Sequence, residues 1–473
     1  MKLFVVAADA AIPEYILDQK HLFPNLCKLI DSGASSAYSA YVQKGYRGSY
    51  SSEQNWSSIY TGLTPQEHKL GAHNGVQEIM PEMNTFDGLN PFWEELNKAG
   101  ITVGLWQGDC LDNPTPVNGY VVSGRYTPIF TPSENREASR TIQVSDERIK
   151  KYLNGNPPPR LYPKTLAQLG FTFEQLKENP ALVNKVANED NFKPMLENFH
   201  EELDYWFGAM TRAQRDYPVD VVWWFTPTTD ILPHFTLWCD NNPIIISAYK
   251  MLDEYLGDFV KEFAPDNVIF LSDHGQQNFS KLIKCSDKEI SMEAFKSRDK
   301  VVALENGYLA FEALNGGLLF TSHSLKGVFI AGGKNIRHTT VNEMRTVDVY
   351  PTLLEMLDVK VPKSRSGYVV DIFEKTLLNT DKQLPKDIRY KKLALIQTHE
   401  PCVTDIVLNE LYIASRFSEI TVVGEAKYEE LYRNNPRVSD YITVDCFLQD
   451  NFDEIYCGFY NQTTGLMSHI KIK

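Results

Sequence analysis

The chain has 473 residues, of which 43% are hydrophobic, and its formal net charge is −14. This apolar content is enough for one large α/β domain and a smaller unit, and it argues against disorder. The negative charge provides no basic surface for nucleic acid or for an anionic membrane. No apolar run approaches the ~18 residues of a membrane span.

The cysteines and the first residues indicate the compartment. The seven cysteines are scattered and odd in number, without a close-spaced pair. They fit neither a disulfide framework nor a cysteine zinc site, which favours a reducing compartment. The apolar run at residues 3–8 meets Asp9 too early for a signal peptide, so we interpret it as a first strand. We therefore expect a cytoplasmic protein.

Short apolar runs that stop at polar residues predict buried parallel strands. In chain order they cover residues 3–8, 101–106, 219–225, 268–271 and 327–331. Helical patterns closed by glycine or proline lie between them, as at residues 24–32, 91–99 and 248–263. The alternation predicts a doubly wound, mostly parallel α/β sheet.

Two segments depart from this alternation. From about residue 112 to 218, a proline-rich bend precedes helical stretches, which indicates a largely helical cap inserted into the core. A surface excursion is the alternative. A polar stretch near residues 373–385 then separates residues 1–375 from a small C-terminal α/β domain at 386–473, whose role the sequence does not assign.

Acidic and imidazole side chains follow two of the predicted strands. Asp9 comes directly after the first, and Asp230 and His234 follow the strand at 219–225 with three residues between them. Ligands of open α/β sheets bind beyond the carboxyl ends of the strands, and these side chains suit zinc. Taken singly, Asp9 is equally explained as a capping residue. The spacing of Asp230 and His234 also arises by chance.

The strand at 268–271 gives a stronger signal, because Asp273 and His274 follow it and Gly275 permits a tight turn. Buried polar side chains of this kind need polar partners or a cation. His323 lies a few residues before the strand at 327–331, where a lone histidine is usually structural.

A helix opened by the serines Ser51 and Ser52 and closed at Gly62 is predicted. At the start of a helix, Ser52 would face free amide donors and the positive end of the dipole, which favour an alkoxide and a phosphate. A simple N-cap is the alternative role for such a serine. The preceding basic and aromatic side chains of Lys44, Tyr46 and Arg47 are left outside the predicted site.

The order and spacing of these residues resemble the alkaline phosphatase superfamily, on its nucleotide pyrophosphatase/phosphodiesterase side, over residues 1 to about 372. The matching positions are Asp9, Ser52, Asp230, His234, Asp273, His274 and His323. The stretch from Thr346 to Leu357, with Gly367, resembles the closing helix and turn of that family.

The resemblance implies a two-metal hydrolase of phosphate esters with Ser52 as nucleophile. One dication would be held by Asp230, His234 and His323. The second would be held by Asp9, Asp273, His274 and the oxygen of Ser52. Two such ions stabilise the attacking and leaving oxygens, and a phosphoserine intermediate is then hydrolysed. Zinc is the expected metal, with manganese as the alternative.

Asn55 stands where this branch carries an asparagine that hydrogen-bonds a phosphoryl oxygen, so we expect an oxyanion donor. A solvated helix residue is the alternative. The chain departs from the branch in having Ser52 instead of threonine, Glu53 and Gln54 instead of an apolar residue and proline, and Lys69 instead of glycine.

Three functions are compatible with this sequence. The first is a phosphodiesterase or phosphatase acting on a small phosphate ester, without nucleic acid or membrane partners. The second is a phosphomutase or phosphotransferase on the same core, with the acceptor held by the insertion. The third is a non-catalytic interaction protein that retains the fold. Substrate identity and oligomeric state are not assigned by the sequence.

Overall fold

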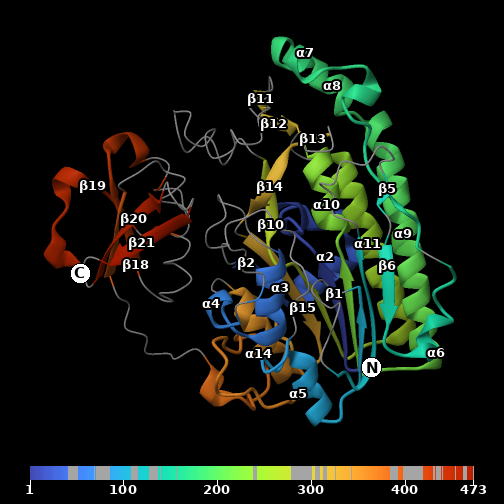
Figure 1. Cartoon of the computed structure of the whole chain (residues 1–473). Helices are drawn as coiled ribbons and strands as arrows, with labels where there is room; N and C mark the ends of the chain where they lie inside the picture. Colours follow the sequence, from blue (N-terminus) through green and yellow to red (C-terminus); the bar gives the residue numbers. More distant parts are fainter. Residues whose placement is uncertain are drawn as a thin grey trace.

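The computed structural model shows an α/β architecture built on one large sheet (Figure 1). The structure describes residues 1–40, 52–68, 70, 86–107, 116–126, 137–138, 140–155, 157–237, 242–278, 301–303, 309–312, 317–324, 326–341, 344–383, 392–397, 408, 419–429, 432, 438, 440–452, 454–461 and 466–471.

The large sheet has nine strands in the order β16-β2-β15-β9-β1-β8-β3-β4-β6. Its centre is parallel and consists of β9 (Asn267–Leu271), β1 (Leu3–Ala8), β8 (Val221–Thr226), β3 (Val103–Trp106) and β4 (Gly119–Tyr126). The remaining strands are β16 (Thr339–Thr340), β2 (Ala34–Ser39), β15 (Lys326–Gly333) and β6 (Arg140–Val144). The prediction of a mostly parallel α/β sheet is confirmed.

Both faces of the sheet are buried, as the continuous apolar strands predict. In β1, Phe4 and Val6 join one hydrophobic cluster, whereas Leu3 and Val5 join the cluster on the opposite face. The first face is covered by α2 (Pro24–Ser32), α9 (Glu189–Asp216), α10 (Thr228–Thr236) and α11 (Pro243–Phe263). The second is covered by α3 (Ser52–Thr61), α5 (Phe92–Lys98) and α14 (Thr346–Met356).

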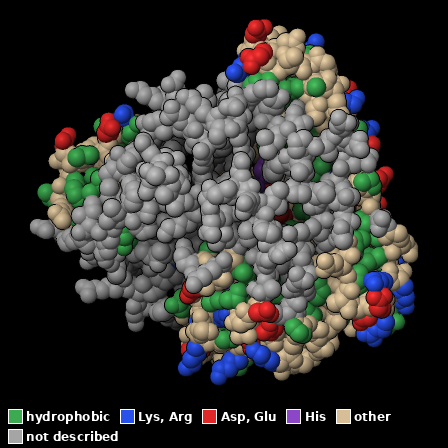
Figure 2. Space-filling model, in the orientation of Figure 1, with side chains coloured by type: hydrophobic (Ala, Val, Ile, Leu, Met, Phe, Trp, Pro, Cys, Tyr) green, Lys and Arg blue, Asp and Glu red, His purple; other side chains and the backbone are tan. Residues whose placement is uncertain are grey.

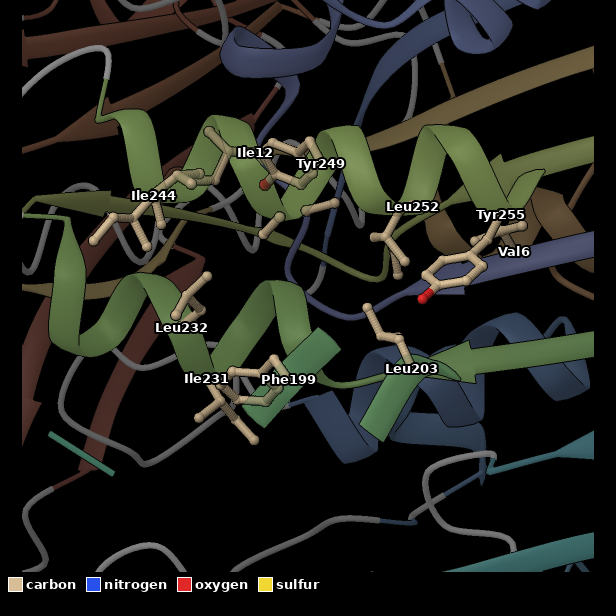
Figure 3. Close-up of a cluster of buried hydrophobic side chains, with 14 of the residues drawn as sticks. Val6, Ile12, Phe199, Leu203, Ile231, Leu232, Ile244, Tyr249, Leu252 and Tyr255 are labelled. Atoms are coloured by element: carbon tan, nitrogen blue, oxygen red, sulfur yellow. The ribbon is translucent and has the colours of Figure 1, made fainter. Parts of the chain in front are cut away.

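The helix after β8, α10, is held by this packing. Its residues Ile231 and Leu232 are buried in the same cluster as Phe199 of α9 and Leu252 of α11, and Ile231 lies beside Phe199 (Figure 3). Burying an aliphatic side chain of this size contributes about 1.5–3 kcal/mol. The polar face of α10 is thereby fixed relative to the sheet.

The predicted direction of the strand at 327–331 is wrong, because β15 pairs antiparallel with both β2 and β9. The reason is the ribbon of β10 (Gly275–Asn278) and β14 (Thr321–Ser324), which are antiparallel to each other. Since β9 leads into β10 and β14 leads into β15, the chain returns beside β9 without the crossover that a parallel strand requires.

The segment assigned to the cap, about residues 112–218, is partly integrated into the core. It supplies β4 and β6 to the main sheet, and α9 packs on one sheet face. Shorter elements in this segment are β5 (Glu137–Ala138), α6 (Glu147–Lys150), β7 (Arg160–Leu161), α7 (Phe173–Glu178) and α8 (Val183–Val186). In Figure 1, α7 and α8 stand farthest from the sheet. The cap boundaries therefore stay a prediction.

The C-terminal residues form a second sheet of five strands in the order β19-β18-β17-β20-β21. These strands are β17 (Lys392–Ile396), β18 (Glu419–Gly424), β19 (Asp440–Thr443), β20 (Glu454–Asn461) and β21 (Leu466–Lys471), of which only β21 pairs antiparallel. The domain boundary at residues 375–386 stays a prediction. Among the described residues, every helix is too short or too polar to cross a membrane.

The remaining short elements are α1 (Pro13–Leu17), α4 (Pro65–His68) and a small antiparallel sheet of β11 (Val301–Ala303), β12 (Leu309–Glu312) and β13 (Leu318–Leu319).

Candidate active site

The candidate site lies beyond the carboxyl ends of three neighbouring strands. The order β9-β1-β8 is contiguous in the sheet, and all three strands run parallel. Asp9 follows β1, Asp273 and His274 follow β9, and α10 after β8 carries Asp230 and His234. The structure therefore brings together residues that are far apart in sequence, as this edge of a parallel sheet predicts.

Ser52 reaches the same edge as the first residue of α3, and the predicted helix is confirmed. The helix ends before Gly62, whose φ of 67° is in the left-handed region that favours glycine. The carbonyl oxygen of Gly62 accepts hydrogen bonds from the backbone of Ser366 and Gly367. These bonds attach the end of α3 to the turn after α14.

The first group of possible ligands consists of Asp230, His234 and His323. The Nε2 atoms of the two histidines are 3.2 Å apart, and they lie 3.3 and 3.2 Å from Oδ1 of Asp230. Ligand atoms about 2.0–2.1 Å from a tetrahedral zinc lie about 3.3 Å from one another. The three atoms therefore form a triangle of the size that a zinc ion fits.

The second group consists of Asp9, Asp273 and His274, whose ligand atoms all lie within 4.8 Å of one another. Nδ1 of His274 lies 3.1 Å from the carbonyl oxygen of Gly275. Because a carbonyl only accepts, Nδ1 of the neutral ring carries the proton and Nε2 presents a lone pair. That Nε2 lies 3.2 Å from Oδ2 of Asp273 and 3.0 Å from Oγ of Ser52.

The lone pairs of His274 and Asp273 repel unless a cation or a proton lies between them. Within the described residues, Oδ2 of Asp273 has no hydrogen-bond partner, although both side chains are 0% exposed. Burial raises the pKa of Asp273, and burial with the neighbouring His323 lowers the pKa of His274. The donors fit a dication, which would relieve this cost of burial.

The two groups differ in their access to solvent and adjoin each other. The side chains of Asp230, His234 and His323 are 14%, 15% and 18% exposed, whereas Asp273 and His274 are buried. The rings of His274 and His323 stack with centroids 4.1 Å apart. A small recessed area of histidine surface is visible near the centre of Figure 2. Burial opposes ionisation of Asp230, but His234 and His323 outweigh it and lower its pKa.

Residues 3–444 of the sequence match the family of type I phosphodiesterases and nucleotide pyrophosphatases. The chain belongs to this family. Comparison with curated proteins gave no match. Human ectonucleotide pyrophosphatase/phosphodiesterase 5 aligns with 14% identity and a TM-score of 0.43, over 78% of this chain and 100% of that chain. The murine protein, inactive and in complex with AMP, aligns with 14% identity and a TM-score of 0.41, over 77% of this chain and 97% of that chain.

Membership in the phosphodiesterase family confirms the resemblance seen in the motifs and supports hydrolysis of phosphodiesters. Asn55, the predicted oxyanion donor, lies one turn after Ser52 on α3. The alternative of a solvated residue is wrong, because Asn55 is 0% exposed. Lys44, Tyr46 and Arg47 lie outside the described residues.

Two residues that hydrogen-bond to the candidate ligands were not identified from the sequence. Trp56 donates from Nε1 to Oδ1 of Asp9 at 3.1 Å, and Gln276 donates from Nε2 to Oδ1 of Asp230 at 2.7 Å. Trp56 lies one helical turn after Ser52, and Gln276 two residues after His274. These spacings were the available signals, because such residues share a face with the predicted ones.

Proposed function

We propose that the chain is a two-metal hydrolase of phosphodiesters that acts through a phosphoserine on Ser52. The observation that supports this best is the contact of Ser52 with His274, which stacks on His323 of the other ligand group. A serine at a helix start, beside one of two adjoining clusters of acid and imidazole, suits an in-line displacement at phosphorus. Family membership supports the same substrate class.

Each of the two clusters would hold one metal ion. Asp230, His234 and His323 would hold one ion, and the buried cluster with the Ser52 oxygen would hold the other. Zinc suits these nitrogen and oxygen donors, with manganese as the alternative. When bound, the dications supply positive charge that lowers the pKa of the serine hydroxyl and stabilises the phosphoryl oxygens.

The residues of the chain would then act as follows. Ser52 Oγ attacks phosphorus while the bond from phosphorus to the leaving oxygen breaks, and the serine proton passes through water to that oxygen, which departs as an alcohol. The amide of Asn55 donates to a non-bridging oxygen, and the amides at the start of α3 bind the developing charge. Water then attacks the phosphorus of the phosphoserine, which releases a phosphate monoester and restores the hydroxyl of Ser52.

The test is Ser52→Ala, with metal content measured on wild type and variant. We expect about two metals per chain in wild type, loss of bis-p-nitrophenyl phosphate hydrolysis in the variant, and a phosphorylated Ser52 peptide after rapid acid quenching of wild type. Full activity in Ser52→Ala would overturn the nucleophile. Recovery of an isomeric phosphate without release of hydrolysis product would instead indicate a phosphotransferase.

The proposed substrate is a small phosphodiester such as a nucleotide derivative, and faster hydrolysis of diesters than of p-nitrophenyl phosphate is expected. A cytoplasmic location belongs to the same proposal and rests on composition. Among the described cysteines, Cys27 and Cys446 are free thiols. Fractionation of cells that express the chain, with markers for each compartment, tests the location.

A further inference from the structure

Gln276 bonds to one member of the solvent-accessible ligand group, lies opposite the second, and is linked to the third through one residue. Its Nε2 donates to the carbonyl oxygen of Asp230 at 2.5 Å and to Oδ1 of Asp230 at 2.7 Å. Gln276 also lies directly opposite His323 in the antiparallel pair of β10 and β14. Residues opposite each other in such a pair share one face of the ribbon, so Gln276 and His323 are neighbours.

The third ligand, His234, is reached through Thr321. Oγ1 of Thr321 donates to Oε1 of Gln276 at 2.7 Å, and both Oγ1 and the carbonyl oxygen of Thr321 lie 3.2 Å from Nδ1 of His234. Since the carbonyl accepts only, Nδ1 of neutral His234 carries the proton. Nε2 therefore presents its lone pair toward Asp230 and His323.

These bonds fix which group donates and which accepts in each hydrogen bond of the series from His234 through Thr321 and Gln276 to Asp230. The two Asp230 oxygens are acceptors, so the NH₂ group of Gln276 must face them, and its oxygen must then face the hydroxyl of Thr321. Glutamate has no such donor, and methionine has neither group. Gln276 and Thr321 are buried, so water cannot readily replace a lost amide.

We propose that Gln276 is a positioning residue that orients Asp230 and, through the hydroxyl of Thr321, supports the His234 tautomer that the carbonyl of Thr321 requires. The inference rests on the proposed function, because it assigns Gln276 to the site that would hold one of the two dications. Mutation of residues that hydrogen-bond to metal ligands typically lowers metal affinity or activity 10–100-fold. The buried group of Asp9, Asp273 and His274 is not part of this series of hydrogen bonds and would keep its ion.

The experiment measures zinc affinity by competition with a chromophoric chelator, in the full chain, for wild type and Gln276→Met. We expect one of the two zinc ions to bind about 10–100-fold more weakly and the other to be unchanged. Gln143→Met, at an exposed position on edge strand β6, is the control and should bind as wild type. Equal affinity of wild type and Gln276→Met for both ions would overturn the inference.

A second pair of variants keeps the test valid if Gln276→Met fails to fold. Thr321→Val removes the hydroxyl and should weaken the same ion, whereas Thr321→Ser restores the hydroxyl and should recover its affinity. Equal affinities in these two variants would also overturn the inference. Absence of zinc from well-folded wild type would instead overturn the two-metal proposal itself, so the two failures are distinguishable.

Discussion

The indole of Trp56 donates a hydrogen bond of 3.1 Å from Nε1 to Oδ1 of Asp9. Trp56 lies on α3, one turn after Ser52, so a single helix positions both the proposed nucleophile and a carboxylate of the buried ligand group. Movement of α3 would therefore displace both groups together.

Trp56→Phe should lower kcat/KM and the affinity of the buried group for zinc by about 10–100-fold, because Asp9 loses its donor. Steady-state hydrolysis and zinc competition measure the two effects. Trp223→Phe is a matched control, since within the described part of the chain the Trp223 indole N–H has no hydrogen-bond partner. Equal losses in both variants would show that packing, not the hydrogen bond, is responsible.

Asn55→Ala should lower kcat by about 10²–10³-fold with metal content unchanged, because a donor to the developing oxyanion is lost. The measurement is steady-state hydrolysis of a diester together with elemental analysis. Gln54→Ala changes the neighbouring buried side chain, whose Oε1 has no hydrogen-bond partner among the described residues. A comparable loss of kcat in Gln54→Ala would contradict the oxyanion role.

His68 should make the protein less stable in mild acid. Its Nδ1 accepts from the backbone N–H of Leu70 at 2.9 Å, and Nε2 contacts Ser58 Oγ at 3.1 Å. Burial lowers the pKa of His68 to about 4. In the unfolded chain histidine has a pKa of about 6.5, so between pH 4 and pH 6.5 the unfolded state binds a proton that folded His68 does not. The stabilisation is therefore complete above about pH 6.5 and lost as the pH falls.

We expect the His68 contribution to the free energy of unfolding to fall by about 2 kcal/mol between pH 8 and pH 5. Urea unfolding of chelator-treated protein at both pH values measures it. His68→Gln should remove this part of the pH dependence, whereas His200→Gln, at a half-exposed position on α9, should leave it unchanged. An identical pH dependence in wild type and His68→Gln would disprove the assignment.

Arg160 of β7 and Glu202 of α9 form a buried ion pair with 3.3 Å between Nη2 and Oε1. Arg160→Met should lower the free energy of unfolding by about 3–5 kcal/mol, because Glu202 loses this partner inside the protein. Denaturant unfolding measures the loss. In the double variant Arg160→Met/Glu202→Leu, the loss should be smaller than in the single variant. A double variant that loses the sum of the single effects would contradict the coupling.

The central strands could be predicted because each is buried on both faces and ends in polar residues. β1 matches its predicted residues, and β8 and β9 lie within one or two residues of theirs. The direction of β15 could not be predicted, because an apolar run carries no information on strand direction. β4 and β6 were missed because polar residues interrupt their apolar pattern, as at Ser123 and Gln143.

The candidate site could be predicted where chemically distinctive residues follow strands. Asp9, Asp273 and His274 are of this kind. Gln276 and Trp56 are spaced to share a face with predicted residues, but their roles could not be predicted, because glutamine and tryptophan occupy many roles and only the fold shows what their donors face. The pairing of His323 with His234 likewise depends on the register of β10 against β14.

The distribution of the two candidate ligand groups along the chain determines when each group can be complete. Ala10, next to Asp9, bonds to Asp273 across 263 residues, and His234 meets His323 across 89 residues. The buried group is complete only after His274 has been synthesised and β9 has paired with β1, and the other group only after His323 has been synthesised. Contacts this distant form slowly, so the proposed ions would be bound by a largely folded chain and not by the chain as it emerges.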